Sequence, residues 1–378
     1  MRLFIFFICN GIVMFCSCEH MPKHRDMQTF DFGNDDYAVS ACTLHDGGMI
    51  IGGSTNSVRE NQDMLIMSID DNNRTVWTKS VGGKTTDRCF NVIELDDHSV
   101  IAVGSVQVAT GNNDMLILRL SKTGEIIWSR NFGGRYNEEG RAAVQSDDGS
   151  ILVVGTTASF GAGSNDVFLV KINKEGLLMW QRTFGGTSVE VGKDIKKLKN
   201  DDFIITGYSS NGIYPFHTFL MKISSEGDEL WQRVYIMGES SEGRSVSELT
   251  DGGYIITGAT RLSRFSDNRS SMVLRTDVDG NVVWYKSYSF GSNEANQGII
   301  IKNNVYAVAG QLMSGNSNAF VMTVDVASGG QMNVKSYGTS GYSSANAILK
   351  KGSDFFIVGW IETDRLKKLD VLIERLNF

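Results

Sequence analysis

Proline and cysteine are both scarce in this chain. Of its 378 residues only 2 are proline and 5 are cysteine, whereas 41 are glycine. This balance excludes collagen-like and proline-rich disordered chains, and 41% hydrophobic residues suffice for a sizeable core. The net charge of −7 comes without any polybasic stripe, so we expect no nucleic-acid partner. No segment with a helical period is long enough to form a second domain.

Long apolar runs are also lacking, except at the N-terminus. Arg2 is followed by mostly apolar residues up to Phe15 and then by a Cys-Ser-Cys tripeptide ending at Cys18. The run is too short and interrupted to span a membrane, so we expect residues 1–17 to be a cleaved secretory signal. The tripeptide resembles a loose form of the bacterial lipoprotein box, as found in Bacteroidetes. This resemblance implies that Cys18 is acylated and that residues 18–26 form a lipidated tether.

The implied address is the bacterial cell envelope, anchored by lipid, at the outer membrane. The periplasmic and the surface side remain open. An ordinary cleaved signal followed by a coincidental cysteine is the alternative to lipidation.

The strongest pattern in the chain is an internal repeat. Five of the six tryptophans recur at intervals of about 51 residues, which indicates an array of one supersecondary unit. These are Trp77, Trp128, Trp180, Trp231 and Trp284. Between them lies a second phrase whose final glycine recurs seven times, as Gly53, Gly104, Gly155, Gly207, Gly258, Gly310 and Gly359. The chain therefore contains seven copies of the unit.

Each copy predicts four short strands separated by glycine-containing turns. In the fifth copy the expected strands are 243–249, 254–259, 272–277 and 282–288. Strands that repeat radially in this way hide their edges by packing unit against unit. We therefore predict an all-β fold, a single seven-bladed β-propeller of four-stranded blades.

The last copy lacks its fourth strand, because the chain reaches Phe378 directly after the third strand, 371–377. Residues 27–33 match the end of a fourth strand and have no blade of their own. We therefore expect an N-terminal strand to complete the last blade, so that residues 27–378 form one domain. The expected blades are approximately 34–83, 84–134, 135–186, 187–238, 239–291, 292–338, and 339–378 with 27–33.

The repeated phrases resemble a known class of bacterial propeller repeat. Asp-Gly-Gly-Tyr at 251–254 and Gly-Glu-Ile-Ile-Trp at 124–128 are similar to repeats in secreted and lipid-anchored Bacteroidetes proteins. The resemblance covers nearly all of residues 27–378 and implies the architecture but no single activity. The phrase 122–128 also resembles the tryptophan-docking phrase of quinoprotein-type propellers, which keeps a quinone-dependent activity open.

Variable segments connect the second and third strands of each blade, and they share one face of the disc, here called the loop face. Binding residues commonly lie on such loops. The aromatic and histidine candidates for contact with a ligand are Trp360, Phe265, Tyr214, Phe216 and His217. The alternative is that these side chains pack the loops onto the disc.

Charged residues near the start of the inner strands form a second candidate site, at the mouth of the central channel. They are Glu139, Arg141, Glu190, Lys193, Glu242 and Arg244. A ring of alternating charge could bind a small ligand, and paired carboxylates could do acid–base work. The alternative is a structural role, in which each acid bonds a neighbouring blade.

Catalytic signals are few, because no His, Cys or Asp cluster has metal-ligand spacing and no second histidine lies near His217. We therefore expect no metal and no cofactor. The favoured function is a non-enzymatic binding or scaffold protein, a monomer that recognises glycan or protein through the loop face. The alternative is a propeller polysaccharide lyase or hydrolase that uses Tyr214, His217 or the channel carboxylates.

Overall fold

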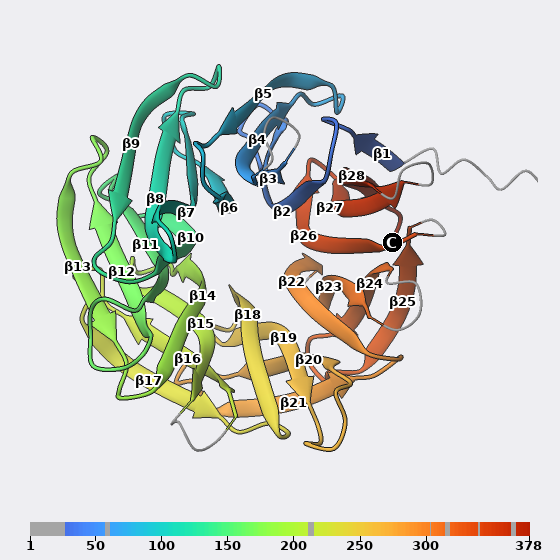
Figure 1. Ribbon diagram of the computed structural model, residues 1–378. Coiled ribbons are helices and arrows are strands. Elements are labelled where there is room, and N and C mark those ends of the chain that lie inside the picture. Colours follow the sequence, from blue (N-terminus) through green and yellow to red (C-terminus); the bar gives the residue numbers. More distant parts are fainter. Residues whose placement is uncertain are drawn as a thin grey trace, which may run out of the picture.

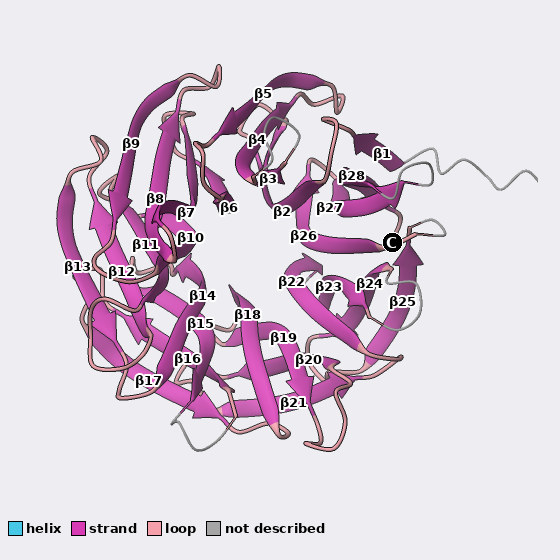
Figure 2. Cartoon of the chain, viewed as in Figure 1, coloured by secondary structure: helices cyan, strands magenta, loops and turns pink. Residues whose placement is uncertain are grey.

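Seven antiparallel sheets of four strands each surround a central axis in the computed structural model (Figure 1). Within the described residues there are 28 strands and no helix. Figure 2 shows the strands in magenta. The all-β, seven-bladed prediction is therefore confirmed. No helix suited to crossing a membrane occurs in this part of the chain. The structure describes residues 27–56, 61–210, 215–302, 304–313, 318–338, 341–363 and 368–378.

The strands of each blade run from the channel outward in chain order. Blades 1 to 4 consist of β2 (Asp36–Thr43), β3 (Met49–Thr55), β4 (Asp63–Ile69) and β5 (Thr75–Val81); β6 (Asp87–Glu94), β7 (Val100–Ala109), β8 (Asn112–Leu120) and β9 (Ile126–Phe132); β10 (Glu138–Gln145), β11 (Ile151–Thr157), β12 (Asp166–Ile172) and β13 (Leu178–Phe184); and β14 (Val189–Lys197), β15 (Phe203–Ser210), β16 (His217–Ile223) and β17 (Glu229–Tyr235).

Blades 5 and 6 follow the same order, and blade 7 takes its outer strand from the other end of the described chain. These blades consist of β18 (Ser240–Glu248), β19 (Tyr254–Arg261), β20 (Ser270–Thr276) and β21 (Val282–Tyr288); β22 (Asn293–Lys302), β23 (Val305–Leu312), β24 (Ala319–Asp325) and β25 (Gln331–Tyr337); and β26 (Ser343–Lys351), β27 (Asp354–Thr363), β28 (Lys368–Leu376) and β1 (Met27–Phe30).

Blade 7 combines residues from the two ends of the described chain. β1 pairs antiparallel with β28, so that Met27 lies opposite Glu374 and Phe30 lies opposite Val371. The inner strand β2 of blade 1 contacts β26, and one hydrophobic cluster includes buried side chains of both blades. Phe30 packs against this cluster. β1 is thus the outer strand of the blade-7 sheet.

The repeated tryptophan and glycine contact each other across neighbouring blades. Trp77 donates its indole N–H to the carbonyl of Lys122, in the next blade, at 2.9 Å. In the same turn Gly124 has a φ of +81°, and a Cβ there would lie 2.7 Å from the Trp77 ring. The same bond joins Trp128 to Lys174 and Trp284 to Val326. The period of the sequence therefore records how each blade packs on the next.

All seven inner strands carry a β-bulge at the same level. Each bulge inserts one unpaired residue, which redirects a side chain at that point. The seven inserted residues, here called the channel ring, are Val39, Phe90, Arg141, Lys193, Arg244, Asn296 and Asn346. All seven line one cavity on the central axis.

Candidate functional site

The cavity inside the channel ring has a volume of about 340 Å³ and an uneven lining. Blades 3, 4 and 5 contribute three successive cations, Arg141, Lys193 and Arg244. The other four blades place two asparagines, a valine and a phenylalanine at their ring positions. Positive charge is therefore concentrated on one side of the channel.

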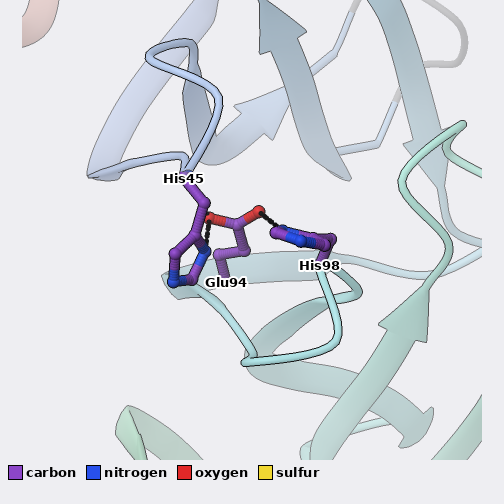
Figure 3. A group of neighbouring side chains, drawn as sticks. All are labelled: His45, Glu94 and His98. Atoms are coloured by element: carbon purple, nitrogen blue, oxygen red, sulfur yellow. Dashed lines mark hydrogen bonds and ion pairs between the residues drawn. The ribbon is translucent and has the colours of Figure 1, made fainter.

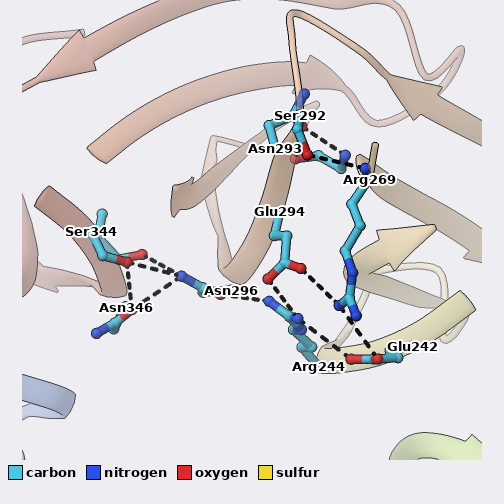
Figure 4. A network of polar contacts seen from close by, with 11 residues as sticks. Glu242, Arg244, Arg269, Ser292, Asn293, Glu294, Asn296, Ser344 and Asn346 are labelled. Atoms are coloured by element: carbon cyan, nitrogen blue, oxygen red, sulfur yellow. Dashed lines mark hydrogen bonds and ion pairs between the residues drawn. The ribbon is translucent and has the colours of Figure 1, made fainter. Parts of the chain in front are cut away.

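Arg244 and Arg269 hold two carboxylates in a network between blades 5 and 6 (Figure 4). An Arg244 Nη2 lies 2.7 Å from Glu294 Oε2 and 3.4 Å from Glu242 Oε2. Arg269 Nη1 lies 2.7 Å from Glu294 Oε1 and 3.5 Å from Glu242 Oε1. Arg244 also donates to Asn296 Oδ1 at 2.9 Å. Glu294 of blade 6 thus binds both arginines of blade 5 and joins the two blades, whereas Glu242 pairs with the same arginines within blade 5.

Arg141 is held in the same way, but by groups of blades 2 and 3. Its guanidinium forms an ion pair with Glu139, two residues earlier on the same strand. The guanidinium carbon also lies 4.1 Å from the ring centroid of Phe90. A cation over an aromatic face is attracted by the ring quadrupole, so Arg141 has two partners that fix its position.

Lys193 is the channel cation that has no ion pair or hydrogen bond among the described residues. Its ammonium nitrogen lies 5.3 Å from the ring centroid of Tyr208. Burial, together with the neighbouring charges of Arg141 and Arg244, lowers the pKa of Lys193 to about 8, against the opposing effects of Glu242 and Glu139. The Lys193 ammonium is therefore the channel charge that is available to an anionic group.

Glu190, which the sequence analysis placed at the channel mouth, lies elsewhere. It accepts the backbone N–H of Gly186 at 3.0 Å, just as Glu138 accepts that of Gly134 at 2.8 Å. Both carboxylates cap the connection from the preceding blade. Glu190 lies three residues before the channel-ring residue of its strand, Lys193, whereas Glu139 lies two residues before Arg141. A shift of one residue in a strand reverses the side on which a side chain lies. Placing it at the channel mouth was therefore wrong.

A groove of about 980 Å³, here called the blade-4 groove, opens where blades 3 and 4 meet on the loop face. It is formed by the connection between β13 and β14, the end of β15, the start of β16 and the outer strand β17. Small and hydroxyl side chains such as Thr187 and Ser209 line it, together with Glu190. Ile236, which is 79% exposed, adds apolar surface.

His217 lies in the blade-4 groove, and its Nδ1 is buried without a hydrogen-bond partner among the described residues. Burial lowers the pKa of His217, while the nearby Glu239 acts in the opposite direction. Burial also raises the pKa of Glu190, and the Asp166 carboxylate adds to this effect. The groove therefore contains an imidazole that stays neutral near pH 7.

The aromatic candidates of the loop face fall in three separate places. Trp360 is half-buried at the boundary between blades 7 and 1, edge-on to Tyr37 at 6.1 Å, so it packs two blades together. Phe265 is 87% exposed on blade 5, with the Arg264 guanidinium 5.0 Å from its ring centroid. Phe216 is 39% exposed beside the blade-4 groove. Tyr214 lies outside the described residues.

Tyr208 connects the two sites, and it was not among the residues predicted from the sequence. Its ring faces Lys193 on one side and meets Phe216 edge-on, with ring centroids 4.8 Å apart. The structure thus links the channel ring with the aromatic residue beside the groove. The only available signal was its place directly after the repeated glycine of the second strand, Gly207.

Three potential metal ligands also went unnoticed, on the face opposite the loop face. His45, Glu94 and His98 come together from two neighbouring blades (Figure 3). A signal was present, because His45 and His98 lie in the corresponding inner turns of successive repeats. Their separation of more than 50 residues concealed it, since spacing alone suggests metal sites only for nearby ligands.

Comparison with known proteins bears on the fold alone. No family model matches the chain, and a search of curated proteins found no match. Among solved structures, the chain is similar to the WD40 domain of Pan2 from Neurospora crassa, with a TM-score of 0.58 and 11% identity over 95% of this chain and 98% of that one. The chain is a seven-bladed β-propeller.

A bacterial protein belongs to the same set of structural neighbours. It is a protein of unknown function from Dyadobacter fermentans, with a TM-score of 0.51 and 11% identity, over 93% of this propeller and 98% of that chain. Identities this low show a shared architecture, and propellers of one architecture serve unrelated functions.

Proposed function

We propose that this propeller is a lipid-anchored, non-enzymatic binding protein of the bacterial cell envelope that holds a neutral glycan in the blade-4 groove. The observation that carries the proposal is the lining of this groove. Its hydroxyl side chains and carboxylates can exchange hydrogen bonds with sugar hydroxyls, while Val234 and Ile236 offer apolar surface to the C–H faces of sugar rings.

The charge of the groove narrows the choice of ligand. Glu190, Glu229 and Glu239 all line it, whereas none of the described lysines and arginines does so. Carboxylates repel an acidic polysaccharide and accept hydrogen bonds from the hydroxyls of a neutral one. A neutral glycan therefore suits this groove better than an acidic one, and a protein segment remains the other class of ligand to test.

The anchoring part of the proposal rests on the sequence around Cys18 and on the position of β1. A tether formed by residues 18–26 would join the disc at the outer strand of blade 7. Two or more acyl chains hold a protein stably on a membrane, whereas one alone binds marginally. Labelling with a palmitate analogue should modify the wild-type chain and fail on Cys18→Ala, and equal labelling of both would exclude this anchor.

A glycan array probed with the full-length chain in detergent tests the binding function. Ile236→Arg places a long charged side chain in the groove at an exposed position, so it should weaken binding at least tenfold without unfolding the protein. Val283→Arg on β21 is the matched control, because Val283 is exposed on another blade and does not line the groove. Equal binding by the two variants would contradict the proposed site.

The same groove favours one alternative, a polysaccharide lyase or hydrolase. The neutral imidazole of His217, whose Nδ1 has no partner among the described residues, could accept a proton, and the raised pKa of Glu190 suits a carboxyl that donates one. Chain shortening of a bound glycan by the wild type, abolished in His217→Ala, would establish this activity. Glu242 is a poor candidate for the same role, because two arginines hold its carboxylate.

A further inference from the structure

We propose that His45, Glu94 and His98 form a site for a divalent metal ion of the Zn²⁺ class, which joins blade 1 to blade 2. His45 lies in the turn between β2 and β3, Glu94 ends β6, and His98 lies in the turn between β6 and β7. These turns belong to the face opposite the blade-4 groove, so the inference is independent of the proposed glycan binding.

One donor atom from each of the three residues lies within 4.8 Å of the other two, and Figure 3 shows Glu94 between the two imidazoles. His45 Nδ1 lies 2.6 Å from Glu94 Oε2, and His98 Nδ1 lies 3.2 Å from Glu94 Oε1. Ligand atoms of a tetrahedral zinc ion are roughly 3.4 Å apart, given bonds of about 2.0–2.2 Å. Small side-chain rotations would therefore bring all three donors onto one ion.

Glu94 is fixed in advance by a contact outside the three side chains. Its side chain is only 6% exposed, and Oε2 also accepts the backbone N–H of His45 at 2.6 Å. A ligating carboxylate that is also hydrogen-bonded is held in orientation before the metal arrives. The side chains of His45 and His98 are about half exposed, which leaves an entry path and a coordination position for water.

The backbone at His98 supplies a separate observation. Its φ is +63°, a conformation in which the corresponding turns of blades 1, 3 and 5 have Gly47, Gly149 and Gly252. A residue with a Cβ costs about 1 kcal/mol or more in this conformation. A histidine here is thus less favourable for the turn than glycine, although blade 4 also has a non-glycine residue, Asp201, in this conformation with a φ of +61°.

The donor set indicates which metals to expect. Two imidazoles and one carboxylate suit zinc and its transition-metal neighbours, whereas Mg²⁺ and Ca²⁺ prefer sites made of oxygen ligands. The neighbouring Asp46 and Lys122 pair with each other at 2.9 Å, so they add little net charge beside the cluster. Three protein ligands would leave the fourth position of a tetrahedral ion open.

The test is titration of the full-length chain, purified in detergent without a polyhistidine tag, with ZnCl₂ by calorimetry. Wild type should bind one ion at this site, and Co²⁺ should give the absorption bands of a tetrahedral nitrogen and oxygen complex. His45→Ala and His98→Gly should each weaken Zn²⁺ binding at least 100-fold. His98→Gly is informative because it restores the residue that other blades have in this turn, so the variant should fold at least as well as wild type.

The remaining histidines provide the controls. His20→Ala/His24→Ala and His217→Ala remove every other imidazole of the chain and should leave the affinity unchanged. The proposal is overturned if wild type binds Zn²⁺ no better than His98→Gly, or if the loss appears only in His20→Ala/His24→Ala. A wild-type chain whose melting temperature rises with Zn²⁺, beside a His98→Gly chain whose melting temperature does not, would support the link between blades.

Discussion

The Lys193 ammonium faces the ring of Tyr208 at 5.3 Å, and this contact joins the channel ring to the aromatic residues of blade 4. Tyr208 in turn meets Phe216 edge-on. The two arginines of the channel ring have carboxylate partners, whereas Lys193 has none among the described residues. An unpaired, largely desolvated charge makes the free energy of folding less favourable. The Lys193 ammonium is such a charge, and it lies in the cavity on the central axis.

Replacing Lys193 with methionine should stabilise the protein at pH 7 by about 1–2 kcal/mol, because burial of the charge opposes folding. Since the pKa is lowered to about 8, the folded state releases this proton more readily than the unfolded chain, in which lysine titrates near 10.4. The stability of wild type should therefore rise between about pH 8 and pH 10.4, and the advantage of Lys193→Met should shrink.

Urea denaturation of both proteins at pH 7, 9 and 10 measures this change. Lys199→Met is the matched control, because Lys199 is exposed on a turn and should show no comparable effect. A gap between wild type and Lys193→Met that stays constant with pH would contradict the assignment of the lowered pKa to Lys193.

Removing Arg244 should destabilise the protein far more than removing an exposed arginine. Arg244→Met leaves Glu294 and Glu242 with Arg269 as their remaining partner, so we expect a loss of about 2–4 kcal/mol. Arg375→Met breaks a pair with Asp354 in which both side chains are more than one-third exposed, and this should cost at most about 1 kcal/mol. Chemical denaturation of the two variants compares them, and equal losses would refute a structural role for the network.

The contact between Gly124 and Trp77 predicts an unusually costly glycine substitution. Gly124→Ala adds a Cβ 2.7 Å from the indole at a φ of +81°, so it should destabilise by about 2–4 kcal/mol. Gly111→Ala is a matched control, because Gly111 has a similar φ of +75° and open space around the added atom. It should cost about 1 kcal/mol from backbone strain alone. Thermal melts of the two variants separate the packing effect from the backbone effect.

The repeat made the fold predictable, because the same residues solve the same packing problem in each blade. Trp77 and Gly124 are far apart in the sequence, yet both recur with the period of the blade that brings them together. The order of the strands could be predicted from this period and from the residues of the turns.

The candidate site was harder to predict from the sequence, because the position of its side chains depends on the register of the strands. Glu190 and Glu139 have similar neighbours, but Glu139 pairs with Arg141 of the channel ring, whereas Glu190 accepts the backbone N–H of Gly186.

The bulges could not be read from the sequence either, because a bulge is a property of two paired strands. Arg141 and Lys193 enter the channel only because the register shifts at each of them. The cluster of His45, Glu94 and His98 depends in the same way on how two turns of neighbouring blades meet. Contacts that recur in every blade could therefore be predicted from the sequence, whereas sites made of residues that differ from blade to blade could not.

Removing residues 1–33, and with them β1, should destabilise the propeller. β28 then loses the strand that covers its outer edge, and blade 7 loses Phe30 from its core. Deleting residues 1–26 keeps β1 and should leave the melting temperature within about 2 °C of the full chain. The deletion up to Gly33 should lower it by at least about 5 °C and promote association through the exposed edge. Melting curves and light scattering of the two truncations test this, and equal stability of both would show that β1 contributes nothing to holding blade 7 together.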